Sequence, residues 1–432
     1  MADYDAIVVG SGCAGSVAAY ELASAGRSVL LVDRGIRPGT KTMAGGRIYI
    51  HSLKDVFPDC EKEAPFERRV THERISMMGS KSDFTIDFTS SAMSVEGQDS
   101  YTVLRSRLDP WLASKAEAAG AKTLFGSPVT SLVKDGSGKV AGVVVDGKEI
   151  SAEVVVLADG INSLLVHDAV GAPETPNPMA VAVSVKEVIS LPKDVISDRC
   201  GVVSDDEGTA WLFMGDSTDG LIGGGLMYAN KESISLGLVL GVAGAAEQAP
   251  TPIYQMLEDF KKHPTVAAMI KGGEVVEYSA RMIPEGGYGA MPKLVGDGVM
   301  IAGDNAYMCL NIGYQVRGMD FAVAAGMHAG QCAAQALDKG DVSAKGLESY
   351  VKALEDSFVL KTFKYYQNTP TFMGKHPEIF SKYPDAIGEM MNSMFIVNDE
   401  VTPPLIDSVE DMTKKIGLFQ LLKDANGAMR AL

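Results

Sequence analysis

The sequence is poor in cysteine, and its few cysteines are widely separated. Cysteine occurs at five of 432 positions, and no two of them form a C-x-x-C pair. The five are Cys13, Cys60, Cys200, Cys309 and Cys332. This spacing excludes a disulfide framework and an iron–sulfur site built by this sequence alone. Sparse, unpaired cysteine is typical of a reducing compartment, so we expect a cytoplasmic protein.

Positive charge and long apolar runs are also scarce. The 39 basic residues are outnumbered by 55 acidic ones, which gives a formal charge of −16 and argues against a nucleic-acid partner. No run of 18 or more apolar residues occurs, and the most apolar stretch, Ile234–Ala246, contains serine and three glycines. We therefore expect no membrane span, and leave open a peripheral contact with the inner face of the cell membrane. No signal peptide is expected either, since the first motif begins almost at Met1.

Residues for nucleophilic or metal-dependent catalysis are not grouped in this sequence. The six histidines show neither metal-ligand nor triad spacing, and no Gly-x-Ser-x-Gly motif occurs. We therefore predict no catalytic side chain and no metal ligand.

A dinucleotide-binding motif occupies the first 34 residues. Gly10, Gly12 and Gly15 follow an apolar strand and open a helix predicted over residues 14–25. In this pattern the glycines allow a tight turn, the approach of a pyrophosphate and close helix packing. Asp33 lies 18 residues after Gly15, where a carboxylate can accept ribose hydroxyls. A glycine turn without a ligand is the alternative. The contacts expected here come from Gly10, Gly12, Cys13, Ala14, Gly15, Asp33 and Arg34.

The order of predicted elements indicates an α/β protein. We expect a Rossmann-like FAD-binding domain, an inserted β-rich domain and a helical C-terminal region. Predicted elements include a helix over 111–119, a hairpin over 129–145, a buried strand over 154–157 and a helix over 253–262. The first part of the FAD-binding domain is expected at residues 1–172, with an irregular insertion at about 51–100. The β-rich domain should follow at 173–290. The chain should then return to the FAD-binding domain at 291–345 and end in the helical region at 346–432.

Three further pieces distinguish FAD from NAD. Gly303-Asp304 follows a buried strand and precedes a helix predicted over 317–337, where a carboxylate can accept ribityl hydroxyls. Asp159-Gly160 is a turn at the end of a strand, and Arg105 precedes a helix. Taken singly, each has an ordinary alternative: an Asp N-cap, a β-turn and a solvated arginine.

In this order, these motifs resemble flavoproteins of the p-hydroxybenzoate hydroxylase fold, which implies FAD. A finer resemblance is to the FixC (EtfC) flavoproteins of the electron-transfer-flavoprotein:quinone oxidoreductase family, and it runs almost from end to end. Five segments carry it: Lys41–Tyr49, Tyr101–Asp109, Gly215–Gly225, Val299–Ala306 and Asn311–Asp320.

The resemblance implies positions for the remaining cofactor contacts. Arg105 and the strand at Val129 would flank the adenine and pyrophosphate, with support from Ala158, Asp159 and Gly160. Gly303 and Asp304 would hold the ribityl chain. The flavin ring would meet Asn311, Gly313 and Tyr314 on one side and Gly45, Gly46 and Arg47 on the other. An ordinary surface arginine remains the alternative for Arg47.

The resemblance also implies an electron-transfer role within a complex. The expected partners are EtfA/EtfB-like (FixA/FixB-like) electron transfer flavoprotein subunits, a ferredoxin-like FixX/EtfX iron–sulfur subunit and quinone, in a bifurcating assembly. A quinone slot is expected near Gly223–Tyr228 and Tyr278–Arg281, although these glycines alternatively serve sheet packing. A stand-alone FAD-dependent reductase or monooxygenase of an apolar small molecule is the other hypothesis.

Overall fold

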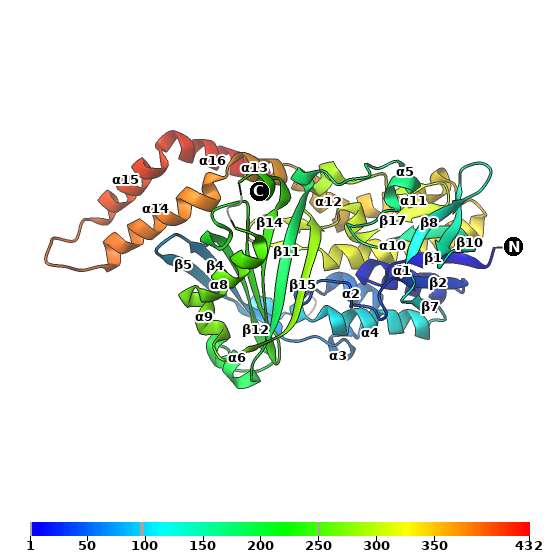
Figure 1. Ribbon diagram of the computed structural model, residues 1–432, viewed down its shortest axis with the longest axis horizontal. Coiled ribbons are helices and arrows are strands. Elements are labelled where there is room, and N and C mark those ends of the chain that lie inside the picture. The colour runs from blue at the N-terminus through cyan, green and yellow to red at the C-terminus, as the bar shows by residue number, and fades with distance from the viewer. Residues whose placement is uncertain (1, 96–98, 249–250) are drawn as a thin grey trace.

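Two β-sheets organise the chain. The computed structural model describes residues 2–95, 99–248 and 251–432. An eight-stranded sheet near the N-terminus and a nine-stranded sheet beside it are linked by several crossings of the chain, and helices of the C-terminal region extend from the far side of the second sheet (Figure 1). The predicted fold class, a Rossmann-like FAD-binding domain with an inserted β-rich domain and a helical C-terminal region, is confirmed.

The first sheet has a parallel centre made of short apolar strands. Its main path is β16 (Val295–Gly296), β17 (Val299–Ile301), β10 (Lys148–Leu157), β1 (Tyr4–Val9), β2 (Val29–Asp33) and β7 (Lys122–Phe125). The pairs from β17 to β7 are all parallel. Parallel strands are covered on both faces, which explains the apolar runs at residues 6–9, 29–32 and 154–157. The hairpin of β8 (Val129–Lys134) and β9 (Val140–Val145) pairs onto β10, as predicted.

Three helices of this sheet pack closely on one another. They are α1 (Cys13–Ser24), α4 (Arg105–Ala118) and α10 (Met319–Lys339), with α11 (Ala344–Asp356) against α10. A Cβ at Gly326 of α10 would lie 2.2 Å from the carbonyl oxygen of Ala14. Small residues therefore let α10 approach α1, which brings the N-terminal ends of both helices to one region.

The second sheet is formed mainly by long antiparallel strands. Its order is β15 (Glu274–Pro284), β11 (Val181–Ser190), β14 (Ser233–Gly241), β13 (Gly223–Ala229), β12 (Glu207–Gly215), β4 (Arg69–Met78), β6 (Ser100–Val103) and β3 (Gly46–Tyr49), with β5 (Asp83–Thr89) paired to β4. A second apolar core lies between this sheet and α6 (Lys193–Cys200), α8 (Ile253–Lys262) and α9 (Pro264–Ile270). The bounds of α8 are those predicted from the sequence.

The prediction of an irregular insertion at about 51–100 is wrong. This segment contributes β4, β5 and β6 to the second sheet, after the short helices α2 (His51–Val56) and α3 (Cys60–Glu63). In β4 the consecutive polar residues His72, Glu73 and Arg74 interrupt the alternation of apolar side chains that marks a strand. Pairing with β12 on one side and β5 on the other supplies the order that the local sequence does not specify.

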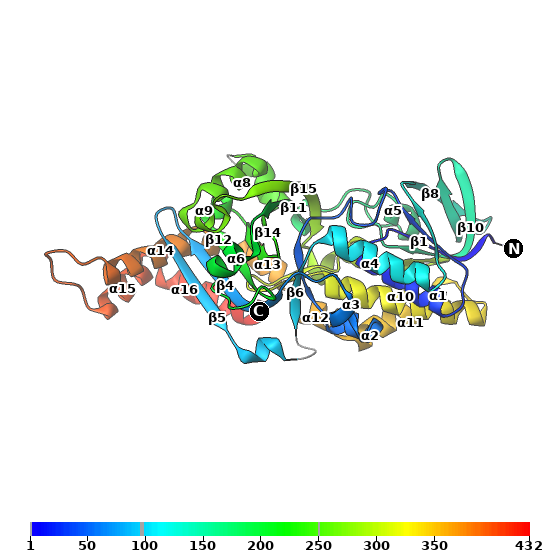
Figure 2. The same ribbon diagram turned by 90° about the horizontal axis from the view of Figure 1, so that it is seen from below.

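The C-terminal region is a series of helices. The helices are α12 (Phe358–Tyr365), α13 (Thr369–Lys375), α14 (Glu378–Phe395), α15 (Leu405–Ile416) and α16 (Leu418–Ala431). Of these, α13, α14 and α15 begin at or beside a proline, and α16 begins after Gly417. Helices α14 and α15 form an arm that projects from the molecule at the end opposite the N-terminus (Figures 1 and 2). Among the described residues, no helix combines the length and apolar character needed to cross a membrane.

The remaining elements are short. They are α5 (Val166–Val170), α7 (Val242–Gln248), β18 (Leu310–Asn311), β19 (Val316–Arg317) and several single 3₁₀ turns.

Candidate cofactor site

A cavity of about 520 Å³ lies between the two sheets. This volume is typical of pockets for cofactors and small molecules. Fifteen of the twenty predicted contact residues line it: Gly10, Gly12, Cys13, Ala14, Asp33, Arg34, Gly46, Arg47, Arg105, Val129, Ala158, Asp159, Gly160, Gly303 and Asp304. The fold therefore brings together residues that are almost 300 positions apart in the sequence.

The glycine turn after β1 is forced by close backbone contacts. Gly10 has φ +99°, and a Cβ there would lie 2.3 Å from the carbonyl oxygen of Ala158. A Cβ at Gly15 would lie 1.8 Å from the carbonyl oxygen of Gly10. Gly15 thus packs α1 against the turn and does not line the cavity. The first residues of α1, Cys13 and Ala14, do line it, so the unpaired amides and positive dipole end of the helix face the cavity.

Asp33 is held at the end of β2 by hydrogen bonds. Its Oδ2 accepts from the backbone N–H and the hydroxyl of Ser11, both at 2.7 Å, and its Oδ1 accepts from the Gly35 N–H at 2.6 Å. A carboxylate has about four acceptor positions, so one remains beside the cavity. A ribose hydroxyl can be accepted there without displacing a protein partner.

Arg105 is a buried ion-pair partner. It begins α4, and its guanidinium donates to both carboxylate oxygens of Asp109, at 2.6 and 2.9 Å. Burial opposes ionisation of both groups. Burial is the largest single influence and lowers the pKa of Arg105, but the charge and hydrogen bonds of Asp109, together with Cys13 and Asp304, outweigh it and leave that pKa raised. A Cβ at Gly12 would lie 3.5 Å from Arg105 Nη2. The alternative of a solvated arginine is wrong, since this fixed cation lies at the glycine turn.

The turn after β10 carries a buried acid. Asn305 Nδ2 donates to Asp159 Oδ1 at 3.0 Å. Burial raises the pKa of Asp159 to about 6, although a hydrogen bond from Ser163 and the nearby cations Arg34 and Arg281 oppose that rise. Gly160 has φ +84°, and a Cβ there would lie 2.0 Å from Arg281 Nη2. The positive φ favours glycine in this turn, and the absence of a side chain there leaves room for Arg281 from the second sheet.

Asp304 presents a carboxylate to the cavity with no partner among the described residues. It lies in a 3₁₀ turn (Gly303–Ala306) after β17, whose N-cap is Ala302. The N-cap of α10 is Gly318. The alternative of an Asp N-cap is therefore wrong, and the carboxylate is available to accept hydrogen bonds from a ligand.

Four of the predicted ring contacts lie outside the cavity wall. A Cβ at Gly45 would lie 1.8 Å from Ser235 Oγ, so Gly45 packs on β14. Asn311 Nδ2 donates to Glu285 Oε1 at 3.2 Å, the Gly313 N–H donates to Asn311 Oδ1 at 2.9 Å, and Tyr314 is exposed. Residues 316–319, a few positions later in the sequence, form the wall in their place.

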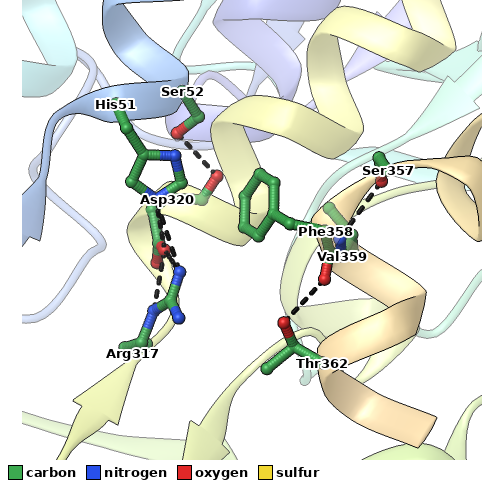
Figure 3. A network of polar contacts seen from close by, with 8 residues as sticks. All are labelled: His51, Ser52, Arg317, Asp320, Ser357, Phe358, Val359 and Thr362. Carbon is green, nitrogen blue, oxygen red and sulfur yellow. Dashed lines mark hydrogen bonds and ion pairs between the residues drawn. The ribbon is translucent and has the colours of Figure 1, made fainter. Parts of the chain in front are cut away.

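Arg317 is held at this wall by a polar network (Figure 3). Arg317 Nε donates to Asp320 Oδ2 at 2.9 Å, and His51 Nε2 lies 3.3 Å from the same oxygen. Asp320 is 1% exposed, and its carbonyl accepts from the Ser52 hydroxyl at 2.9 Å. The Arg317 guanidinium also lies over the ring of Phe321, 4.5 Å from its centroid. In the same view the Ser357 hydroxyl caps α12 by accepting from the Val359 N–H, and the Thr362 hydroxyl donates to the Phe358 carbonyl.

The predictions named only Gly46 and Arg47 of the second sheet as cofactor contacts, and they named Tyr228 and Arg281 only as part of a quinone slot. The strands of this sheet also supply Ser184, Lys186, Leu226, Tyr228, Val239, Arg281 and Ile283 to the cavity. A lysine in the middle of the otherwise apolar strand Val181–Ser190 is a signal that could have identified one of them. Burial lowers the pKa of Lys186 to about 8, with a contribution from Arg105.

Cationic side chains outnumber carboxylates on the wall of the cavity, although the protein as a whole is acidic. Seven cationic side chains line it, against three carboxylates, Asp33, Asp159 and Asp304. The cations are Arg34, Lys41, Arg47, Arg105, Lys186, Arg281 and Arg317. Such an excess favours a ligand that carries phosphate.

Comparisons with known families cover most of the chain. Residues 3–198 match a family model described as FAD binding domain. Residues 182–283 match one described as "ETF-QO, ubiquinone-binding", and residues 369–432 match the ETF-QO/FixC family C-terminal domain.

Curated relatives are similar along the whole chain. The chain is 46% identical over 429 residues to "Probable electron transfer flavoprotein-quinone oxidoreductase YdiS" of Escherichia coli (strain K12), covering 99% of each chain. It is 44% identical to "Protein FixC" of the same strain, over 98% of this chain and 97% of that one. It is 39% identical to "Protein FixC" of Bradyrhizobium diazoefficiens, over 91% of each.

Solved structures share the fold at low identity. A geranylgeranyl bacteriochlorophyll reductase-like protein from Thermoplasma acidophilum aligns with a TM-score of 0.70 and 21% identity, over 96% of this chain and 95% of that one. The flavin-dependent brominase Bmp2 aligns with a TM-score of 0.63 and 16% identity, over 95% and 98%.

FAD is the cofactor of this protein, and the cavity fits it. The glycine turn at the N-terminal end of α1 offers amides for a pyrophosphate, and Asp33 and Asp304 offer free acceptor positions at separate points of the wall. The positive charge of the wall complements the two phosphates. Contact between each predicted residue and the cofactor stays a prediction.

Proposed function

Because this chain belongs to the ETF-QO/FixC family of FAD-dependent oxidoreductases, we propose that it accepts electrons from an EtfA/EtfB-like electron transfer flavoprotein and passes them towards quinone. One observation carries this proposal. The wall of the FAD cavity includes Lys186, Leu226 and Tyr228, which belong to the segment similar to the ubiquinone-binding model. A flavin in this cavity would lie next to that segment, and such proximity favours electron transfer between the two.

The residues of the chain bind and orient the cofactor, while FAD supplies the redox chemistry when bound. Gly10, Gly12 and the N-terminus of α1 would hold the pyrophosphate, and Asp33 a ribose hydroxyl. Asp304 would accept from the ribityl chain. Arg105, fixed by Asp109, would hold positive charge beside the phosphates. Outer-sphere electron transfer needs no nucleophile, which agrees with a site built from binding groups.

We also propose the finer assembly. The electron transfer flavoprotein would be a FixA/FixB-like pair, and a ferredoxin-like FixX/EtfX subunit would carry the iron–sulfur centre, in a bifurcating complex. The similarity to proteins named FixC over 98% of the chain supports this assembly. The complex would act in the cytoplasm, with peripheral contact at the inner face of the membrane, where quinone resides.

A reduction experiment tests the proposal. The FAD-loaded chain is mixed anaerobically with NADH, with and without a purified EtfA/EtfB-like pair, and flavin absorbance is followed before and after a water-soluble quinone is added. We expect reduction only with the pair, and reoxidation by quinone. Direct reduction by NADH or NADPH with turnover of an apolar organic substrate would favour the alternative, a stand-alone reductase or monooxygenase. The sequence motifs alone leave that alternative open.

A further inference from the structure

Three of the seven cations that line the cavity form an ion pair with a carboxylate. Arg105 pairs with Asp109, Arg317 with Asp320, and Arg47 with Glu73. Of the other four cations, Arg34 and Lys41 are exposed and Arg281 lies near Asp159, whereas Lys186 forms no ion pair with a described carboxylate. Burial and the positive charge of Arg105 lower the pKa of Lys186, and the thiol of Cys309 opposes them.

Lys186 is nevertheless held in one position. It lies in the middle of β11, where its register partner on β14 is Gly237. A Cβ at Gly237 would lie 2.4 Å from Lys186 Cγ, so glycine is needed there to let the aliphatic stem pass. Beyond the stem, Nζ donates to the Gly45 carbonyl at 2.9 Å and lies 5.6 Å from the centroid of the Tyr228 ring. The ammonium is therefore fixed at the cavity wall by its strand, a glycine groove and one carbonyl.

An unpaired cation in such a place needs a physical reason. Removing an ammonium from water is unfavourable unless a negative charge or several hydrogen bonds replace its hydration. A single carbonyl does not do so, and burial lowers the pKa of Lys186 to about 8 accordingly. The group is still mainly cationic at neutral pH. The missing negative charge is therefore expected from a ligand of the cavity.

We propose that Lys186 is the counter-ion of the reduced cofactor and thereby sets its reduction potential. Two electrons from the electron transfer flavoprotein and one proton from water convert the neutral flavin ring to an anion, so the cavity gains one negative charge. The Lys186 ammonium stabilises that charge and has no competing carboxylate. The inference rests on the proposed function only for the source of the electrons.

The test is a spectroelectrochemical titration of the FAD-loaded full chain with mediator dyes, without electron transfer flavoprotein or quinone. Lys186→Met removes the charge at similar volume, and Lys186→Arg retains it. We expect Lys186→Met to lower the reduced-to-oxidised ratio at a fixed potential at least tenfold, which is about 30 mV for a two-electron couple. Lys186→Arg should stay within threefold of the wild type. The control is Lys262→Met, which removes an exposed lysine, paired with Asp259, from the same domain.

A wild-type ratio in Lys186→Met, at wild-type FAD content, would overturn the proposal. If Lys186→Met does not fold, Lys186→Gln retains a donor for the Gly45 carbonyl and serves as the neutral variant, and a wild-type ratio there has the same meaning. An equal drop in Lys262→Met would also overturn it, because any lost charge would then suffice. The titration contains neither partner nor quinone. Failure to reduce quinone would therefore contradict the proposed function and leave the role of Lys186 standing.

Discussion

At the scale of single residues, the buried pair of Arg105 and Asp109 is the strongest electrostatic element of the site. Asp109 is fully buried, and both of its oxygens accept from Arg105. Removing one partner of such a pair leaves an uncompensated charge, which is far more unfavourable than losing a surface pair. The pair thus links the stability of α4 to the charge beside the glycine turn.

We expect Asp109→Asn to lower the free energy of unfolding by about 3–5 kcal/mol and to weaken FAD binding, because Arg105 loses its anchor. Urea unfolding and a fluorescence titration of FAD measure the two effects. Asp411→Asn is the matched control, since Asp411 forms an exposed pair one turn from Lys414 and should change stability by less than about 1 kcal/mol. An unchanged unfolding midpoint in Asp109→Asn would contradict this account.

Asp159 makes the stability of the cofactor-free chain depend on pH in a specific direction. Its pKa is about 6 in the folded chain, mainly because of burial, and about 3.9 for an unperturbed aspartate. The folded state therefore holds the proton more tightly, and stability falls as pH rises from about 4 through about 6. Asp159→Asn keeps the acceptor for Asn305 but cannot ionise. Its melting temperature relative to wild type should rise across this window and be constant above it. A constant difference from pH 4 to 7 would contradict the shift.

At the scale of helices and strands, an element could be predicted where its own sequence shows the apolar periodicity and the end signals of a helix or strand. The strand–turn–helix of β1 and α1 and the helix α8 have apolar periodicity and clear ends, and the structure has them at or near the predicted bounds. Strand β4 has no such pattern, because three polar residues interrupt it and its order comes from β12 and β5.

The residues of the cofactor site show the same contrast between local and long-range signals. Gly10, Asp33 and Asp304 were predictable because their chemistry and spacing are local. Lys186 reaches the cavity from β11, whose pairing partners are distant in sequence, so local spacing did not place it there. Tyr228 was expected only as part of a quinone slot, for the same reason.

Close packing of α1 against α10 gives a prediction at this scale. We expect Gly326→Ala to destabilise the chain by about 1–3 kcal/mol, because the new methyl would meet the Ala14 carbonyl at 2.2 Å. FAD affinity should fall as well, since both helix N-termini border the cavity. Gly244→Ala in α7 is the control, since a Cβ there meets nothing within 4 Å. Alanine's higher helix propensity should then stabilise by about 0.5–1 kcal/mol. If the two variants changed the melting temperature by the same amount, a packing constraint at Gly326 would be ruled out.

At the scale of the whole molecule, the cofactor cavity is the place where the two sheets meet. One wall comes from the parallel sheet and its helices, and the other from β11, β13, β14 and β15. The protein has a formal charge of −16, yet cations predominate on this inner wall. Without a bound anion, the cations that lack a carboxylate partner repel one another across the boundary between the sheets. A ligand that reaches both Asp33 and Asp304 should therefore stabilise the molecule as a unit.

Ligand removal tests this coupling. We expect removal of FAD to lower the melting temperature, and its return at one hundred times the dissociation constant to restore about 2.7 kcal/mol of stability. FMN lacks the adenosine half that Asp33 and the glycine turn would hold. It should therefore raise the melting temperature much less than FAD at equal concentration. Differential scanning fluorimetry of the stripped chain with each ligand measures both. If FMN stabilised as strongly as FAD, occupancy of the cavity from Asp33 to Asp304 would be wrong, since the flavin half alone would then account for all of the coupling.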